Sequence, residues 1–175
     1  MGNPDAWDRL WTPHRMAYIK GEGKPAHDGE GDHCPFCRSQ ADAGDSERDD
    51  LVISRGELVY AVLNKFPYNA GHLLICPYRH IPDYTDLTES ETGEFAAFTQ
   101  HSMRVLREAS APHGFNIGMN QGTVAGAGIS AHLHQHVVPR WGGDTNFMPV
   151  VGGTKVLPQL LTQTRELLAA VWQEV

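Results

Sequence analysis

Hydrophobic and polar residues alternate along several short stretches of this chain. Apolar side chains recur at every second position, or fill short runs bounded by Gly, Pro, Asn or Asp, which is typical of β-strands. Short connections between such runs favour antiparallel neighbours. The predicted strands are residues 51–53, 58–63, 71–76, 115–120 and 132–138.

Two longer stretches follow the period of an α-helix instead. Thr88-Glu89-Ser90-Glu91 has the pattern of a capping box, and it opens a predicted helix that runs to about Ala109. A second helix is predicted from Lys155 to Val175, where leucines recur at helical spacing. The pattern therefore predicts an α+β fold: an antiparallel sheet, a long helix between strands and a C-terminal helix.

The length of 175 residues suits a single domain, 1–175, with a sizeable core. Aromatic and aliphatic residues within 1–20 predict an N-terminal segment that anchors on the core. Residues 38–50 are acidic and polar without any apolar period, so we expect a mobile loop there.

Composition excludes some partners. Hydrophobic residues make up 41% and charged residues 20% of the chain, as in soluble globular proteins. No apolar run approaches the roughly 20 residues that span a bilayer, and the N-terminus lacks a signal pattern, so we expect a cytoplasmic protein without a membrane partner. A net charge of −7 argues against general nucleic-acid binding, although Lys65 or Arg140 could still contact a single nucleotide's phosphates.

Histidines stand at positions 132, 134 and 136. In an extended segment, alternate side chains share a face, so the three imidazoles lie together while Leu133 and Gln135 point the other way. Three imidazoles on one face form either a metal site or a nucleophile with two supporting groups.

A glycine-rich loop from Asn120 to Ser130 leads into these histidines. Glycine lets backbone N–H groups approach a ligand closely, and successive N–H groups form an anion-binding concavity. A phosphate-binding loop next to candidate nucleophilic histidines indicates phosphoryl or nucleotidyl transfer.

The chain has three cysteines, two of them in the motif Cys34-Pro35-Phe36-Cys37. A redox pair would need a strand before the motif and a helix after it, which the flanks do not suggest. A structural zinc site would need two further ligands. His33 and His72 are among the candidates, and unmetallated cysteines remain a third interpretation.

At this point a family resemblance becomes specific. The run His-Leu-His-Gln-His-Val-Val resembles the signature of the histidine triad superfamily of nucleotide hydrolases and transferases. Residues 62–77 resemble that family's strand–turn–strand, and residues 115–120 resemble the strand that feeds its phosphate loop. Residues 10–16 and 139–144 look like an actinobacterial branch assigned to diadenosine tetraphosphate phosphorylases.

The resemblance implies a role for each candidate residue. His134 would be the nucleophile that forms a covalent AMP-histidine, and His136 would contact the phosphate and help the leaving group. Asn64 would hold the ribose hydroxyls. The developing charge would be held by Asn120 and by the loop residues Gly126, Ala127, Gly128 and Ser130.

The same resemblance supplies the missing metal ligands. Zinc-bearing members pair the Cys-x-x-Cys motif with two histidines, which map onto His80 and His132. Cys34, Cys37, His80 and His132 would then hold a structural Zn²⁺. The superfamily is typically homodimeric and its branch includes larger assemblies, so we expect a homodimer or higher homo-oligomer.

The sequence also bears on whether phosphate or water accepts the nucleotidyl group. Hydrolase branches carry Gln four residues before the first triad histidine, whereas this chain has Gly128. Inorganic phosphate would then replace water, and diadenosine tetraphosphate would yield ADP and ATP. The alternatives are hydrolysis of dinucleoside polyphosphates or AMP-phosphoramidates, a nucleotide-binding regulator without turnover, and a metal site made of all three histidines.

Overall fold

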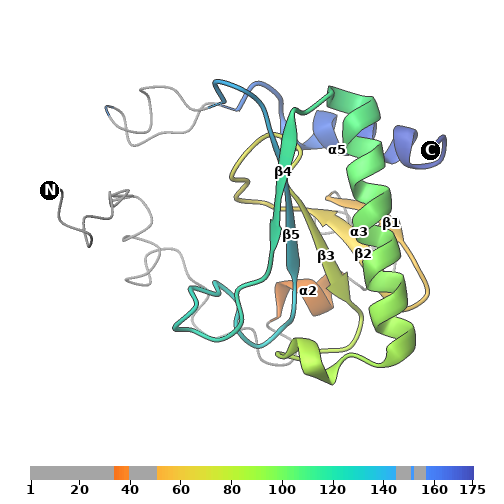
Figure 1. The fold of residues 1–175 in the computed structure, drawn as a ribbon, viewed down its shortest axis with the longest axis vertical. Helices are drawn as coiled ribbons and strands as arrows, with labels where there is room; N and C mark the ends of the chain where they lie inside the picture. Colours follow the sequence, from red (N-terminus) through yellow and green to blue (C-terminus); the bar gives the residue numbers. More distant parts are fainter. Residues whose placement is uncertain (1–33, 40–50, 145–150, 152–156) are drawn as a thin grey trace, which may run out of the picture.

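The computed structural model describes residues 34–39, 51–144, 151 and 157–175 (Figure 1). The predicted anchor, 1–20, lies outside these residues, as does nearly all of the predicted acidic loop, 38–50. Both remain expectations from the sequence.

Five antiparallel strands form one sheet in the order β1-β2-β3-β5-β4. A short turn joins β1 to β2, residues 64–72 connect β2 to β3, and a long helix separates β3 from β4 (Figure 1). The predicted α+β fold is therefore confirmed. The strands are β1 (Val52–Arg55), β2 (Val59–Leu63), β3 (Leu73–Pro77), β4 (Gly114–Gly118) and β5 (Gln135–Arg140).

Alternating side chains divide the core into two layers. On one face of the sheet, Ala61, Ile75 and Val137 pack with the long helix and the C-terminal helix. On the opposite face, Val62 and Leu74 belong to a smaller cluster that includes the cysteine motif. Because the period is two, the even-numbered residues of β2, β3 and β5 all face this second layer.

Helix α3 (Glu89–Ser110) matches the predicted long helix. Thr88 caps it, accepting a hydrogen bond from the Glu91 N–H, while Glu91 accepts one from the Thr88 N–H. Helix α5 (Leu161–Trp172) begins later than the predicted Lys155, so that boundary was wrong. Pro158 explains part of the delay, since a proline disfavours helical geometry in the residue before it.

The predicted strand 132–138 also starts late, because β5 begins at Gln135. The ladder between β4 and β5 ends at the pair Gly118–His136. Before that pair the chain bonds elsewhere, since the Leu133 N–H donates to the Ile81 carbonyl at 2.6 Å. Two short helices complete the described structure: α2 (Pro35–Arg38) and the 3₁₀ turn η2 (Tyr84–Asp86).

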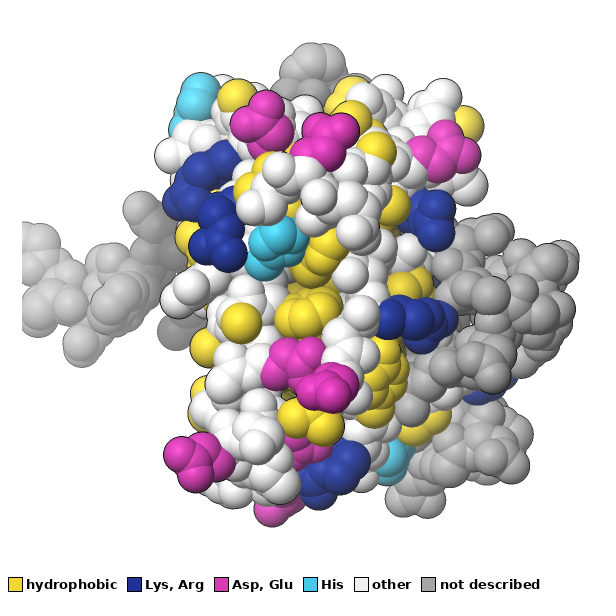
Figure 2. Space-filling model, turned by 90° about the vertical axis from the view of Figure 1, so that its right-hand side faces the viewer, with side chains coloured by type: hydrophobic (Ala, Val, Ile, Leu, Met, Phe, Trp, Pro, Cys, Tyr) yellow, Lys and Arg dark blue, Asp and Glu magenta, His cyan; other side chains and the backbone are white. Residues whose placement is uncertain are grey.

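Acidic and basic side chains are interspersed over the face shown in Figure 2, with hydrophobic side chains between them. Within the described ranges, none of the helices is both long and apolar enough to cross a membrane.

Candidate active site and metal centre

The three sequence-predicted histidines lie on the sheet face opposite α3 and α5. The His134 ring lies 5.2 Å from the His136 ring, centroid to centroid, and 4.9 Å from the Phe36 ring. The His132 ring contacts the same phenylalanine at 5.4 Å. Gln135 points the other way and donates to the Thr99 hydroxyl in α3. The predicted alternation therefore holds, even though His132 and His134 precede the strand.

His134 is buried, and one of its ring nitrogens is committed. Its Nδ1 lies 2.9 Å from the His132 carbonyl oxygen, so Nδ1 carries the proton and donates it. The other nitrogen, Nε2, is left with a lone pair. Burial lowers the pKa of His134 below its ordinary value, because desolvation disfavours the imidazolium. The side chain is thus held as a neutral imidazole.

His136 receives the opposite tautomer through His72. The Tyr68 backbone N–H donates to His72 Nδ1 at 3.0 Å, so the proton of His72 sits on Nε2. His72 Nε2 lies 2.9 Å from His136 Nδ1 and donates to it. This hydrogen-bond network assigns the proton of neutral His136 to Nε2. Adjacent imidazoles therefore carry different groups at Nε2, a lone pair on His134 and an N–H on His136.

We call the hydrogen bonds from the Tyr68 N–H to His72 and from His72 to His136 the histidine relay. The turn between β2 and β3 carries its first two members. Asn64 Oδ1 accepts the Phe66 N–H at 2.9 Å, and its Nδ2 lies 3.3 Å from His72 Nδ1. Gly71 adopts a φ of +74°, a conformation that favours glycine, immediately before the buried His72. Asn64 thus lies beside the relay and in contact with the same histidine that orients His136.

In the glycine-rich loop, two of the amides that were predicted to bind phosphate donate to carbonyl groups of the loop itself. The Gly126 N–H donates to the Thr123 carbonyl at 3.1 Å, and the Ala127 N–H donates to the Gly122 carbonyl at 3.4 Å. Ile129 packs on the cluster that includes Cys34 and Phe36, which brings this end of the loop to the histidine face. The amides of Gly128 and Ser130 form no such turn bond with described residues.

Four sequence-predicted metal ligands come together at the end of the site. The donor atoms of Cys34, Cys37, His80 and His132 all lie within 4.8 Å of one another. His132 Nδ1 is 3.4 Å from Cys34 Sγ and 3.2 Å from His80 Nδ1. In a zinc tetrahedron with the usual bond lengths, the ligand–ligand distances are about 3.3 to 3.8 Å. The observed spacing fits such an ion.

The surroundings of His132 also suit a ligand. Its Nε2 donates to the Pro77 carbonyl at 2.9 Å, which leaves Nδ1 unprotonated toward the cysteines. Burial lowers the pKa of His132 to about 4. The hydrogen bond to Pro77 opposes this shift, whereas the nearby His80 and His134 add to it. Burial and the adjacent Cys34 raise the pKa of Cys37 to about 11. A dication among these groups would favour the thiolates over the thiols.

Three elements hold this cluster against the sheet. Cys34 precedes α2 and Cys37 lies within it, and the Tyr60 hydroxyl of β2 fastens the helix by donating to the Phe36 carbonyl at 2.8 Å. The Leu133–Ile81 backbone bond joins the segments that carry His132 and His80. Cys34 and Cys37 are free thiols rather than a disulfide.

Two residues of the site were not assigned a role from the sequence. His72 was considered only as an alternative zinc ligand, and Tyr68 was not singled out. Strand alternation could have found His72, since it shares a parity with Leu74, which pairs with His136. No comparable signal marks Tyr68, because its position depends on how the turn folds back.

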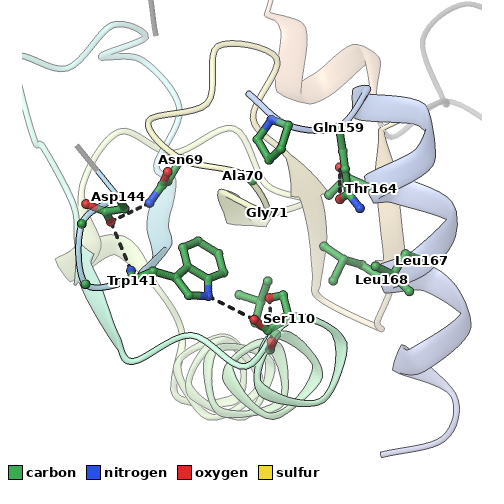
Figure 3. Close-up of a pocket in the computed structure, with 14 residues that line it drawn as sticks. Asn69, Ala70, Gly71, Ser110, Trp141, Asp144, Gln159, Thr164, Leu167 and Leu168 are labelled. Atoms are coloured by element: carbon green, nitrogen blue, oxygen red, sulfur yellow. Dashed lines mark hydrogen bonds between the residues drawn. The ribbon is translucent and has the colours of Figure 1, made fainter. Parts of the chain in front are cut away.

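Arg140, a possible phosphate contact, is engaged elsewhere. It pairs with Asp144 at 2.6 Å and donates to Asn116. Asp144 also accepts from Asn69, at the rim of a pocket of about 420 Å³ (Figure 3). Leu106 and Leu168, which line this pocket, belong to the opposite core layer, so the pocket does not contain the histidines.

Comparison with known proteins defines the class. Residues 45–143 match the HIT domain family, and the chain belongs to that family. A solved structure described as a Zn-bound histidine triad family protein from Mycobacterium smegmatis matches with a TM-score of 0.63 and 26% identity. That match covers 85% of this chain and 96% of the other.

One relative extends over almost the whole chain. A protein of Mycobacterium tuberculosis described as an AP-4-A phosphorylase is 49% identical over 172 residues, covering 98% of this chain and 88% of the relative. A bis(5'-nucleosyl)-tetraphosphatase (asymmetrical) from Schizosaccharomyces pombe is 33% identical over 89 residues, covering 51% of this chain and 48% of the relative. The first match extends well beyond the HIT domain, whereas the second covers about half of this chain.

Proposed function

We propose that this protein is a nucleotidyltransferase that phosphorolyses diadenosine tetraphosphate through a covalent AMP-histidine. The observation that carries the proposal is the opposite tautomers of two adjacent imidazoles. His134 offers a lone pair, as a nucleophile requires, and His136 carries an N–H that can donate a hydrogen bond to the leaving oxygen. The relationship to the mycobacterial AP-4-A phosphorylase supplies the substrate class.

The chemistry proceeds in two balanced steps. His134 Nε2 attacks an α-phosphorus, the bond to the bridging oxygen breaks, and ATP leaves as an anion whose leaving oxygen accepts a hydrogen bond from the His136 Nε2–H. Inorganic phosphate then attacks the AMP-histidine, the P–N bond breaks, and ADP leaves. The electron pair of the P–N bond returns to His134 Nε2, the proton of the attacking phosphate oxygen passes to solvent, and the enzyme is back in its starting state.

Neutral His134 and the surrounding amides support this sequence. A protonated imidazole has no lone pair for attack, and burial keeps His134 in its neutral form. Asn120 lies two residues beyond the end of β4, whose Gly118 pairs with His136. We assign the nonbridging oxygens to Asn120 and to the amides of Gly128 and Ser130, and the ribose to Asn64. The Gly126 and Ala127 amides contribute by holding the loop in shape.

Phosphate as the acceptor is supported by Gly128 and by the mycobacterial relative. A position without a side chain leaves room for a second anion beside backbone amides. Hydrolysis is the second candidate, since the yeast relative is described as a tetraphosphatase. The nearly full-length match favours phosphorolysis, because it covers the segments outside the HIT domain as well.

The proposal includes a structural zinc ion held by Cys34, Cys37, His80 and His132. The distances within this cluster and the Zn-bound neighbour from M. smegmatis support it. Bound there, the ion would fix α2 and the segment that precedes β5. It would also polarise His132, whose carbonyl orients His134.

The role of His134 has a direct test. His134→Asn should abolish turnover, by a factor of about 10³ or more, because no other group replaces the nucleophile. Nucleotide binding should change little, since the phosphate loop and Asn64 remain. Mass spectrometry of rapidly quenched wild-type enzyme should find one AMP added on the peptide that contains His134.

The matched control is His113→Asn, an imidazole that bonds the Gly142 N–H outside the site. It should keep its turnover and its adduct. An adduct on a different residue, or near-normal turnover of His134→Asn, would move the nucleophile elsewhere.

A further inference from the structure

Tyr68 has an unusual position above the histidine relay. Its ring is stacked on the His136 ring at 5.5 Å between centroids and 24° between planes. The same ring contacts the His72 ring at 4.7 Å and 40°. The tyrosine thus covers the pair whose nitrogens are joined by the 2.9 Å bond, yet half of its own surface is exposed.

We propose that Tyr68 is a positioning residue for His136, holding its ring and shielding the His72–His136 hydrogen bond from water. The inference rests on the proposed function only for its catalytic consequence. It adds a residue that acts through two groups at once. The Tyr68 backbone N–H sets the tautomer of His72, and the Tyr68 ring fixes the plane of His136.

The need for such a cover follows from the hydrogen bond itself. His136 Nδ1 accepts the hydrogen bond from His72, and this bond by itself does not fix the plane of the imidazole, which can rotate about its Cβ–Cγ bond. Water that reached the two nitrogens would compete for the bond and permit the other tautomer. A stacked aromatic ring restricts rotation and excludes water from that side, an effect of about two- to tenfold on an equilibrium.

The turn that carries Tyr68 is anchored from its other side. The buried amide of the next residue, Asn69, donates to the Pro139 carbonyl at 3.0 Å and to Asp144 at 2.8 Å (Figure 3). These bonds tie the turn to β5 and to the segment after it. Tyr68 is therefore placed by the fold and does not depend on a ligand to reach His136.

The catalytic test separates the ring from the hydroxyl. Tyr68→Ala and Tyr68→Leu should lower kcat about tenfold with less than a twofold change in KM, because ordering of the leaving-group donor matters in the transition state. Tyr68→Phe retains the stack and should keep at least half of the wild-type kcat. The control Tyr84→Ala removes an aromatic ring that packs on Phe95 instead and should leave kcat unchanged.

A second readout needs no turnover. Nitrogen-15 spectra of the histidine rings should show His136 as a single Nε2–H tautomer in the wild type and in Tyr68→Phe. In Tyr68→Ala and Tyr68→Leu they should show a mixture or faster exchange. Unchanged spectra together with kcat within twofold of wild type in folded Tyr68→Leu would overturn the proposal. If the wild type does not act on diadenosine tetraphosphate, the proposed function fails, but the spectra still decide the role of Tyr68.

Discussion

At the scale of single residues, three histidines of one short repeat are given three different environments. His132 donates through Nε2 to Pro77, His134 donates through Nδ1 to His132, and His136 accepts at Nδ1 from His72. The three bonds fix a different combination of ring nitrogen and protonation for each imidazole. The repeated residue type therefore supports three separate tasks, and the partners rather than the sequence spacing distinguish them.

The four-residue cluster leads to a prediction about metal content. Protein purified without chelator should contain one zinc per chain, and Cys37→Ser should lose most of it, because serine is a poor zinc ligand. Chelation should lower the Tm of the wild type, since metal that binds only the folded state stabilises it. It should have little effect on Cys37→Ser.

Cys76→Ala is the matched control for this prediction. Cys76 is buried in the layer next to the cluster, but it is not among the four grouped donors. The variant can lose stability through packing, yet it should retain its zinc. Wild-type protein without zinc would contradict the prediction.

Sequence reasoning worked for residues whose chemistry is marked by spacing. The Cys-x-x-Cys spacing marked Cys34 and Cys37, the family resemblance supplied His80 and His132, and the structure brings these four together. Sequence reasoning did not assign Tyr68, because stacking on His136 depends on a turn anchored through Asn69. Such a contact has no periodic signature in the chain.

At the scale of elements, boundaries were predicted well where a local signal exists. The capping box at Thr88 and Glu91 placed the start of α3 correctly. The starts of β5 and α5 were wrong. For β5 the cause is tertiary: Leu133 pairs with Ile81 instead of extending the ladder to β4, and alternation alone carries no information about such a partner.

Strand β4 leads to a prediction about assembly. It is the last strand of the sheet order, and Ile117 on it is 45% exposed. Among the described strands β4 lies at an edge, and an edge strand with an exposed apolar side chain is suited to pairing with another strand. Light scattering should therefore give the mass of a homodimer or a larger homo-oligomer, and Ile117→Asp should shift it toward the monomer.

Val175→Asp provides the control for this substitution. It adds the same charge at another exposed apolar position, at the end of the chain. Its mass should match that of the wild type. A monomeric wild type would contradict the prediction, and equal masses for both variants would place the contact away from Ile117.

At the scale of the whole molecule, the larger hydrophobic core and the candidate active site lie on opposite faces of the sheet. Helices α3 and α5 cover one face and build the larger core layer. The opposite face carries the imidazoles, the relay turn and the thiol cluster. The α+β fold followed from hydrophobic alternation. The acceptor of the nucleotidyl group did not, because the choice between phosphate and water depends on the glycine-rich loop, about which hydrophobic alternation gives no information.

The central claim is that phosphate accepts AMP from the enzyme, and product analysis tests it most directly. Purified enzyme should be given diadenosine tetraphosphate with millimolar phosphate, and separately without phosphate, and its nucleotides separated by chromatography. We predict equal amounts of ADP and ATP with phosphate, and turnover that is strongly reduced without it. AMP and ATP as the main products at millimolar phosphate would contradict the account and leave hydrolysis as the function.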